Sequence, residues 1–316
     1  MKRQMVYPMV EQNRIINGQP LVERNQVLHG KSVADRILDE VSSQVQAMKE
    51  QGISPFLMTL EVGNDPASQV YHDAQRRVAH RAGINYESIE LSAATSQSRL
   101  LGYVDRINKD GFINGLIVHV PLPEHIDSRA IQPAIDRKKD VEGVTPCNLG
   151  GLFLGAQGLR PCTAQAIVAL IKSTGVDLRG REVTIVGHSD IVGKPVALLL
   201  LHEEATVSVC HFATYQRGNL EEYVRNAEIL VVAVGKPDLI KGEWIREGAV
   251  VIDAGINTVG DQIVGDVEFA PAQERASYIT PVPGGVGTVT TAYLMKNTLE
   301  ALRWQTEGRF PPAAPS

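Results

Sequence analysis

The sequence predicts an α/β protein with two domains, the second of which is a Rossmann-type, doubly wound parallel sheet. The chain has 316 residues, more than one hydrophobic core usually organises. Short apolar runs alternate with segments of helical periodicity in both halves, a rhythm typical of βαβ units. Residues 136–162 are rich in Gly, Pro and Asp, so the boundary between the domains is expected there.

In the first half, apolar residues recur at helical spacing over residues 31–51, and Gly52 supplies a stop signal. The apolar run 56–62 predicts a strand. The other predicted elements of this half are helices at 68–82 and 96–108 and strands at 86–91 and 115–120. Because proline blocks further strand pairing, the Pro-Leu-Pro sequence at 121–123 ends the last strand, and we expect the active loop directly after it.

In the second half the alternation begins again. Strands are predicted at 183–186, 206–210, 229–232 and 250–252, and helices at 164–173, 194–202 and 220–226. Residues 1–28 are polar and aperiodic and predict an N-terminal arm, while the Pro- and Ala-rich end, 307–316, predicts a disordered tail.

The charge and composition of the chain limit the classes of binding partner that we expect. A net charge of −5 and a pI near 5.9 favour neither nucleic acid nor anionic membranes. The sequence has no run of about 18 apolar residues, and its first residues lack an apolar signal segment, so we expect a cytoplasmic protein without membrane association. The three cysteines, Cys147, Cys162 and Cys210, lack metal-ligand spacing, which predicts neither a disulfide nor a metal site.

A glycine turn follows the strand predicted at 183–186. It runs from Gly187 to Gly193 and leads into a helix, an order that places backbone N–H groups where a pyrophosphate can sit. Strict GxGxxG spacing is absent, so this turn alone is equally consistent with a tight βα turn that binds nothing. A second glycine turn at Val234-Gly235 follows the strand 229–232, and the pair favours a ligand cleft.

Seven stretches together resemble the bifunctional methylenetetrahydrofolate dehydrogenase and methenyltetrahydrofolate cyclohydrolase family, the FolD proteins. The resemblance covers roughly residues 28–305, and the stretches are 63–71, 121–123, 139–143, 161–163, 187–195, 253–257 and 280–287. Members of this family oxidise 5,10-methylenetetrahydrofolate by hydride transfer to NAD(P) and hydrolyse the methenyl product to 10-formyltetrahydrofolate. Most are homodimers, and folate binds in the cleft between their two domains.

The resemblance implies, after the arm at 1–28, a folate-binding catalytic domain at 29–148 and an NAD(P)-binding Rossmann domain at 149–288. It also implies a last helix at about 289–306 that returns to the first domain. The catalytic positions that it implies are Tyr71, Gln75, His119 and Glu142. The implied folate contacts are Ser68, Tyr71, Pro121, Leu122, Glu142, Pro283, Gly284 and Gly285. The implied cofactor contacts are Thr163, Gly187, His188, Ser189, Ile191, Val192, Gly193, His211, Val234, Gly235 and Ile256.

Gln75 and His119 are among the positions that depart from the family. Gln75 stands where the family has the lysine of its cyclohydrolase chemistry, four residues after Tyr71 and so on the same helical face. Glutamine exchanges no proton near neutral pH, whereas hydrolysis needs an acid and a base. His119 replaces a glutamine that contacts this lysine, and it is either a relocated acid/base or a hydrogen-bonded histidine at a strand end.

The hypothesis is therefore a methylenetetrahydrofolate dehydrogenase with weak or absent cyclohydrolase activity. The alternatives are the full bifunctional enzyme, a noncatalytic folate-binding paralogue, and a dehydrogenase that acts on another small substrate. The family default for the cofactor is NADP. His188 and Phe212 stand where relatives place an arginine and a serine on the 2′-phosphate, which makes NAD an equal alternative.

Overall fold

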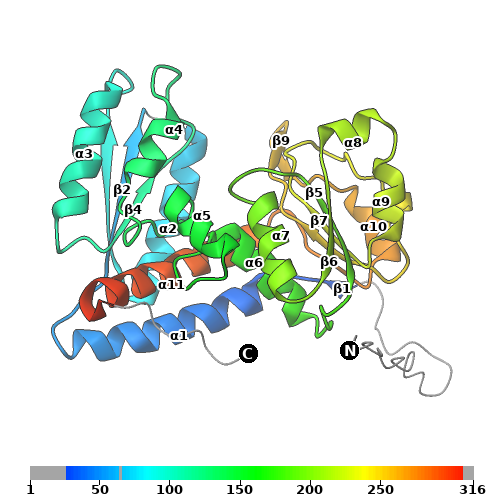
Figure 1. The fold of residues 1–316 in the computed structure, drawn as a ribbon, viewed down its shortest axis with the longest axis horizontal. Helices are drawn as coiled ribbons and strands as arrows, with labels where there is room; N and C mark the ends of the chain where they lie inside the picture. The colour runs from blue at the N-terminus through cyan, green and yellow to red at the C-terminus, as the bar shows by residue number, and fades with distance from the viewer. Residues whose placement is uncertain (1–25, 64–65, 309–316) are drawn as a thin grey trace, which may run out of the picture.

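The computed structural model describes residues 26–63 and 66–308, and the side chains of residues 66–71 lie outside that description. Most of the expected arm and of the expected tail therefore also lie outside the described residues. Figure 1 shows two α/β lobes side by side above a base of long helices. Within the described ranges, no helix is long and apolar enough to cross a membrane.

The first lobe is a three-stranded parallel sheet with the order β3-β2-β4. Leu60 of the central strand pairs with Val118, so β2 and β4 end side by side. Helix α3 begins where Ser96 Oγ accepts a hydrogen bond from the backbone N–H of Arg99 at 3.3 Å. The elements of this lobe are α1 (Lys31–Lys49), β2 (Phe56–Val62), α2 (Pro66–Ala82), β3 (Asn85–Leu91), α3 (Gln97–Lys109), β4 (Gly115–Val118), α4 (Ser128–Ile131) and η1 (Gln132–Ala134).

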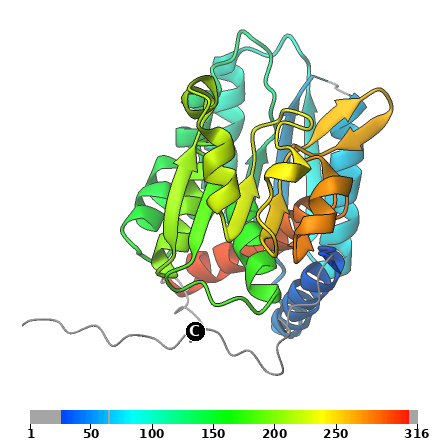
Figure 2. The ribbon, with the colours of Figure 1, turned by 90° about the vertical axis from the view of Figure 1, so that its right-hand side faces the viewer.

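The second lobe is a six-stranded sheet with the order β1-β11-β8-β7-β5-β6, and all its described pairings are parallel. Figure 2 looks onto this lobe and shows helices on both sides of its sheet and a hairpin, β9 with β10, at its rim. The α/β fold with a doubly wound second domain is confirmed. The elements are β1 (Gln26–Val27), β5 (Glu182–Val186), α7 (Gly193–His202), β6 (Thr206–Cys210), α8 (Phe212–Gln216), α9 (Leu220–Asn226), β7 (Ile229–Val232), η2 (Gly242–Trp244), β8 (Val250–Asp253), β9 (Asn257–Val259), β10 (Gln262–Val264), α10 (Phe269–Arg275) and β11 (Tyr278–Ile279).

Three expectations for the ends of the lobes are corrected. Residues 26–28 are not part of an arm, because β1 adds to the edge of the second sheet beside β11. The glycine-rich stretch between the domains contains the helix α5 (Pro146–Phe153), which Thr145 caps by accepting from the backbone N–H of Asn148. The strand expected at 115–120 ends at Val118, since the chain then turns into the prolines.

Three helices join the lobes. Helices α1 and α11 (Val286–Glu307) lie side by side along the base in Figure 1, and α6 (Cys162–Ser173) packs against α11. Their buried faces share one apolar core with strands of both lobes. At the start of α1, the backbone N–H of Gly30 donates to Gly284 O at 2.9 Å, and a Cβ on Gly30 would lie 2.2 Å from Gly285 O. Only glycine therefore fits at residue 30.

Candidate active site

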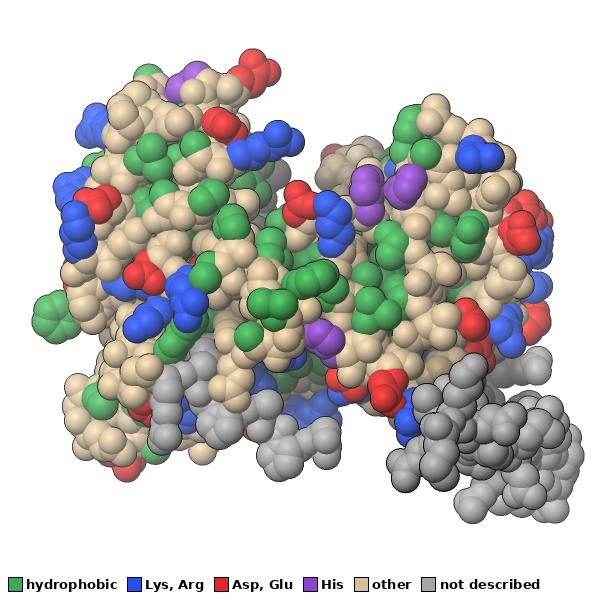
Figure 3. Space-filling model, viewed as in Figure 1, with side chains coloured by type: hydrophobic (Ala, Val, Ile, Leu, Met, Phe, Trp, Pro, Cys, Tyr) green, Lys and Arg blue, Asp and Glu red, His purple; other side chains and the backbone are tan. Residues whose placement is uncertain are grey.

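The candidate site lies at the carboxyl ends of the strands, where the two lobes face each other. In the sheet order β3-β2-β4, the chain passes from β2 to β3 on one side and then crosses to β4 on the other side of β2. The gap between β2 and β4 is therefore a topological switch point, the position where open parallel sheets bind ligands. The space-filling view in Figure 3 shows a hollow between the lobes. The turn after β5 lies within electrostatic reach of the first lobe: its own Lys194 and, more weakly, Arg129 of the first lobe hold the pKa of Asp190 below its ordinary value.

A cluster of buried polar side chains occupies the ends of β2 and β4. Nδ1 of His72 on α2 lies 2.8 Å from Oε2 of Glu61 on β2, and both residues are only 4% exposed. The His72 ring also lies against the ring of His119, with centroids 3.9 Å apart and planes tilted by 35°. Gln75, which is 2% exposed, follows His72 by one helical turn. The structure thus brings Gln75 and His119 together around His72.

Three buried atoms of this cluster have no hydrogen-bond partner among the described residues. They are Oε1 of Gln75, Nε2 of His119 and Oε2 of Glu61, which lies at ion-pair distance from His72 without hydrogen-bond geometry. An unsatisfied buried polar atom is costly, so such atoms are typical of places where a ligand or an ordered water completes the site. Burial lowers the pKa of His119 to about 3, with a smaller effect from His72, and its imidazole is therefore neutral at pH 7.

The loop after the first lobe carries Glu142. Burial, reinforced by the Asp140 carboxylate, raises the pKa of Glu142 to about 7. Asp140 has a structural role, because its carboxylate accepts hydrogen bonds from the backbone N–H of Val144 and Thr145 and from Nδ2 of Asn148. These contacts are those of a turn residue.

On the second lobe, the turn from Gly187 to Gly193 is built by close backbone packing. A Cβ on Gly187 would lie 2.3 Å from Ala233 O, and one on Gly193 would lie 2.1 Å from Gly187 O. Ser189 Oγ accepts from the backbone N–H of Val192 and Gly193 at 3.2 and 3.4 Å, which fixes the start of α7. This turn keeps side chains away from the helix start and fits the phosphates of a dinucleotide.

Two histidines mark the rim of this turn. The rings of His188 and His211 lie with centroids 5.0 Å apart, and Nδ1 of His211 caps α8 by accepting from the backbone N–H of Ala213. Phe212, the first residue of α8, is exposed. Ile191, in the 187–193 turn itself, is also exposed. The side chains at the expected 2′-phosphate position are therefore aromatic rings, with neither an arginine nor a lysine among them.

The second glycine turn differs from the first. The backbone N–H groups of Val234, Gly235 and Lys236 all donate to the buried carboxylate of Asp266, at 2.7 to 3.0 Å. Asn257 Nδ2 donates to the same carboxylate at 2.9 Å. These N–H groups are engaged, so a dinucleotide would meet the side chain of Val234 and the surface of Gly235 instead.

The remaining predicted contacts lie on several elements of the two lobes. Thr163 lies in the first turn of α6, and Ile256 is exposed directly before β9. Pro121 and Leu122 follow β4, and residues 283–285 precede α11. The side chains of Ser68 and Tyr71 lie outside the described residues, so their assignments remain predictions.

Sequence reasoning missed Glu61, His72, Asp266 and Asn297. A charged residue inside the apolar run 56–62 was the one available signal for Glu61, because buried strands rarely hold an unpaired carboxylate. Asn297 donates through Nδ2 to Val141 O and Arg160 O at 2.7 and 2.9 Å, and thus ties α11 to both sides of the Glu142 loop.

Comparison with known proteins decides the family. Residues 28–142 match the model of the tetrahydrofolate dehydrogenase/cyclohydrolase catalytic domain, and residues 161–306 match that of the NAD(P)-binding domain. The chain belongs to the tetrahydrofolate dehydrogenase/cyclohydrolase family. The resemblance seen in the sequence is thereby confirmed.

Relatives within the family match over nearly their whole length. The bifunctional FolD protein of Moorella thermoacetica is 48% identical over 86% of this chain and 96% of its own. The Campylobacter jejuni FolD crystal structure has a TM-score of 0.85 and 38% identity over 88% of this chain and 98% of its own. A Trypanosoma brucei FolD structure with NADP cofactor and an inhibitor has a TM-score of 0.85 and 39% identity, over 89% of this chain and 98% of its own.

Proposed function

We propose that this family member oxidises 5,10-methylenetetrahydrofolate with a nicotinamide dinucleotide and hydrolyses the methenyl product weakly or not at all. One observation supports the second part of the proposal: Gln75 is buried, one helical turn after His72, with its Oε1 unpaired. A neutral amide cannot take or give the proton that hydrolysis moves.

The oxidation needs fewer chemical groups from the protein than the hydrolysis does. The dinucleotide supplies the hydride acceptor, and the residues of the site have to hold the folate against it and exclude water. Glu142 would hold the pterin ring, and the 187–193 turn would hold the pyrophosphate. Gln75 and His119 would contact the folate through their two unpaired atoms. None of these tasks needs a proton to move.

His119 does not replace the family's lysine as an acid. With its pKa lowered to about 3 by burial, His119 carries no proton to donate at pH 7. An effective catalytic acid has a pKa near the working pH, several units above this value.

The buried pair of His72 and Glu61 favours a second candidate, the full bifunctional enzyme. A carboxylate 2.8 Å from an imidazole nitrogen is an arrangement that orients a histidine for proton transfer. In this candidate His72 serves as the acid/base and Glu61 orients it.

The deciding experiment is a spectrophotometric assay of the purified protein with 5,10-methylenetetrahydrofolate and NADP. Reduced cofactor and methenyl product are followed separately. We expect methenyl product to accumulate in step with reduced cofactor and to decay at the uncatalysed rate. Rapid passage to 10-formyl product that is lost in His72→Asn would favour the bifunctional candidate. Folate binding without reduced cofactor would indicate a binding paralogue.

A gain-of-function variant tests whether the residue at position 75 determines the hydrolysis rate. Gln75→Lys restores an ammonium group one turn after His72, and we expect hydrolysis to rise about 100-fold, a typical contribution of acid–base catalysis. Gln75→Met, which matches the glutamine in length but has no polar end, is the control and should leave hydrolysis at the uncatalysed rate. Unchanged hydrolysis in a folded Gln75→Lys protein would contradict the role given to residue 75.

We further propose a homodimer, as the family resemblance implies. Three apolar side chains at the adjoining ends of α5 and α7, Phe153, Leu154 and Leu201, are more than half exposed. Monomeric proteins rarely expose such a patch, which is typical of an interface. Light scattering on the protein and on Leu154→Glu tests this proposal, and a monomer for both would overturn it.

A further inference from the structure

Three turns begin at the same level of the second sheet, at the ends of β5, β6 and β7. The register of the sheet aligns Val186 with Cys210 on one side and with Val232 on the other. A Cβ on Gly187 would lie 2.3 Å from Ala233 O, so the turns after β5 and β7 are in contact. In dinucleotide-binding sheets, the group that contacts the ribose 2′-position follows the first glycine turn by about 20 residues, which is the end of β6 here.

The turn after β7 carries an exposed cation, Lys236. The backbone of this residue is fixed, because its N–H donates to the buried carboxylate of Asp266 at 2.7 Å. Its side chain extends to α8, where Nζ lies 5.2 Å from the centroid of the Tyr215 ring. No described carboxylate forms an ion pair with this lysine, whereas Lys194, the cation of the first turn, is paired with Asp190. The ammonium group of Lys236 is therefore available to a ligand.

Tyr215 brings this ammonium group close to the rim where the 2′-phosphate is expected. The backbone N–H of Tyr215 donates to His211 O at 3.2 Å, so the two residues lie one turn apart on the same face of α8. The His211 ring in turn lies 5.0 Å from that of His188. Neighbours of this kind have Cβ atoms about 5–6 Å apart. Because a lysine has a long and flexible stem, Nζ can pass from the Tyr215 ring to a group beside His211 while the backbone stays fixed.

The side chains at the rim itself supply no permanent cation. His188, His211 and Phe212 place aromatic rings there, where the family resemblance leads one to expect an arginine and a serine. A phosphate group bound at this rim needs a positive charge in contact with it. The next turn of the sheet edge provides one, in Lys236.

We propose that Lys236 determines the preference for NADP by pairing with its 2′-phosphate, and that Tyr215 positions the ammonium group through a cation–π contact. The inference rests on the dinucleotide site proposed above for the 187–193 turn. A lysine binds phosphate as a point charge and needs no bidentate geometry, so it can act from a turn other than the one that carries the family's arginine. NAD has a hydroxyl group at the 2′-position and gains little from this charge.

Calorimetric titration of the purified protein with NADP and with NAD, in the absence of folate, tests the proposal. We expect the parent to bind NADP more tightly than NAD. Lys236→Met removes the charge and keeps an apolar stem, and it should lower the NADP-to-NAD affinity ratio at least tenfold while leaving NAD affinity unchanged. Lys236→Arg should retain the preference. Tyr215→Leu should lower the ratio by a smaller factor, because the ammonium group is then no longer held in place.

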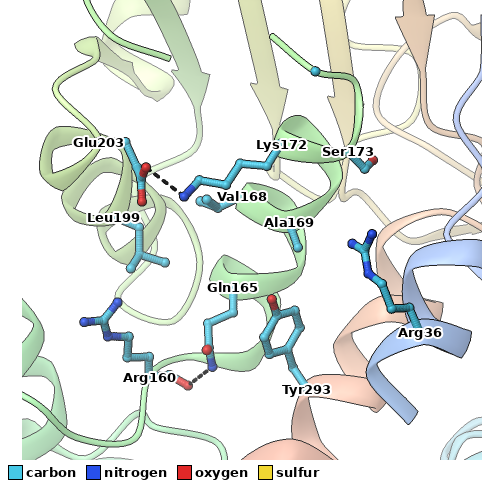
Figure 4. Close-up of a pocket in the computed structure, with 11 residues that line it drawn as sticks. Arg36, Arg160, Gln165, Val168, Ala169, Lys172, Ser173, Leu199, Glu203 and Tyr293 are labelled. Carbon is cyan, nitrogen blue, oxygen red and sulfur yellow. Dashed lines mark hydrogen bonds and ion pairs between the residues drawn. The ribbon is translucent and has the colours of Figure 1, made fainter. Parts of the chain in front are cut away.

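The matched control is Lys172→Met. Lys172 lies on α6 and lines a cavity of about 510 Å³ among the helices that join the lobes, where it is paired with Glu203 at 2.7 Å (Figure 4). This variant changes the net charge by the same amount as Lys236→Met, and its NADP-to-NAD ratio should stay as in the parent. Raising the salt from 0.05 to 0.5 M should reduce the preference of the parent, because the proposed contact is electrostatic and exposed.

Four results would overturn the proposal. They are equal affinity of the parent for both dinucleotides, an unchanged ratio in a folded Lys236→Met protein, an equal loss of affinity for both dinucleotides in that variant, and a preference that disappears in Arg217→Gln but not in Lys236→Met. Arg217 follows Tyr215 by two residues and so lies on another face of α8. A parent that binds neither dinucleotide would overturn the proposed cofactor site together with this inference. Because folate is absent, slow turnover alone does not affect the result.

Discussion

The imidazole rings of His72, in the middle of α2, and His119, directly after β4, lie with centroids 3.9 Å apart and planes tilted by 35°. Oε2 of Glu61 lies 2.8 Å from Nδ1 of His72. The cluster thus holds one carboxylate and two imidazoles beside Gln75, where the family resemblance leads one to expect a lysine.

His119 should make the fold sensitive to acid. Its pKa is about 3 in the folded protein and about 6.5 when unfolded, so between these values the unfolded chain binds a proton that the folded chain does not. Stability is then lost as the pH falls below 6.5, by about 2 kcal/mol at pH 5. Urea unfolding of His119→Gln should lack this loss between pH 7.5 and pH 5. His80→Gln, at an exposed histidine, is the control and should retain it.

Glu142 should set the pH dependence of folate binding. Burial raises its pKa to about 7, and the carboxylate form is the one expected to accept hydrogen bonds from the pterin. The KM for methylenetetrahydrofolate should therefore fall as the pH rises from 6 to 8. Glu142→Gln should raise KM and remove this dependence, whereas Glu87→Gln, on the exposed side of β3, should leave both unchanged. A parent KM that is constant over this range would contradict the assignment.

The sequence predicted the elements well where hydrophobic periodicity was strong. Strands 56–62, 206–210 and 229–232 and helix 220–226 have the predicted bounds. The two-residue strand β1 was missed because its only support is pairing with β11, some 250 residues further along the chain. Helix α5 was missed because Gly150 and Gly151 in its middle signal a loop, while packing against α7 stabilises it.

The site was predicted at the positions that motifs mark and missed at the positions that only packing defines. Gln75 and His119 were found by their spacing from Tyr71 and from the Pro-Leu-Pro loop. His72 precedes no turn and sits in no motif, and its role follows from its contacts with Glu61 and His119. Asp266 acts on N–H groups thirty residues away in the chain, a relationship that spacing cannot show.

Asp266 should be essential for the second glycine turn. Both of its oxygens accept hydrogen bonds from buried N–H groups, so the amide of Asp266→Asn would place N–H against N–H on one side. We expect a loss of about 2–4 kcal/mol in the free energy of unfolding, the cost of leaving charged-group hydrogen bonds unmade. The KM for NADP should rise with kcat nearly unchanged, because the turn borders the cofactor. Asp261→Asn in the exposed β9–β10 turn is the control, and a change below about 0.5 kcal/mol at Asp266 would contradict this role.

The choice between NADP and NAD should depend on His188. This exposed ring lies 5.0 Å from His211 at the rim of the 187–193 turn and offers no fixed charge to a 2′-phosphate. His188→Arg supplies a bidentate cation, and the ratio of kcat/KM for NADP to that for NAD should rise about tenfold or more. Because the gain is electrostatic, it should shrink as salt is raised from 0.05 to 0.5 M. His80→Arg adds the same charge on α2 and should leave the ratio unchanged. A ratio that already strongly favours NADP in the parent, and does not rise in His188→Arg, would show that another group holds the 2′-phosphate.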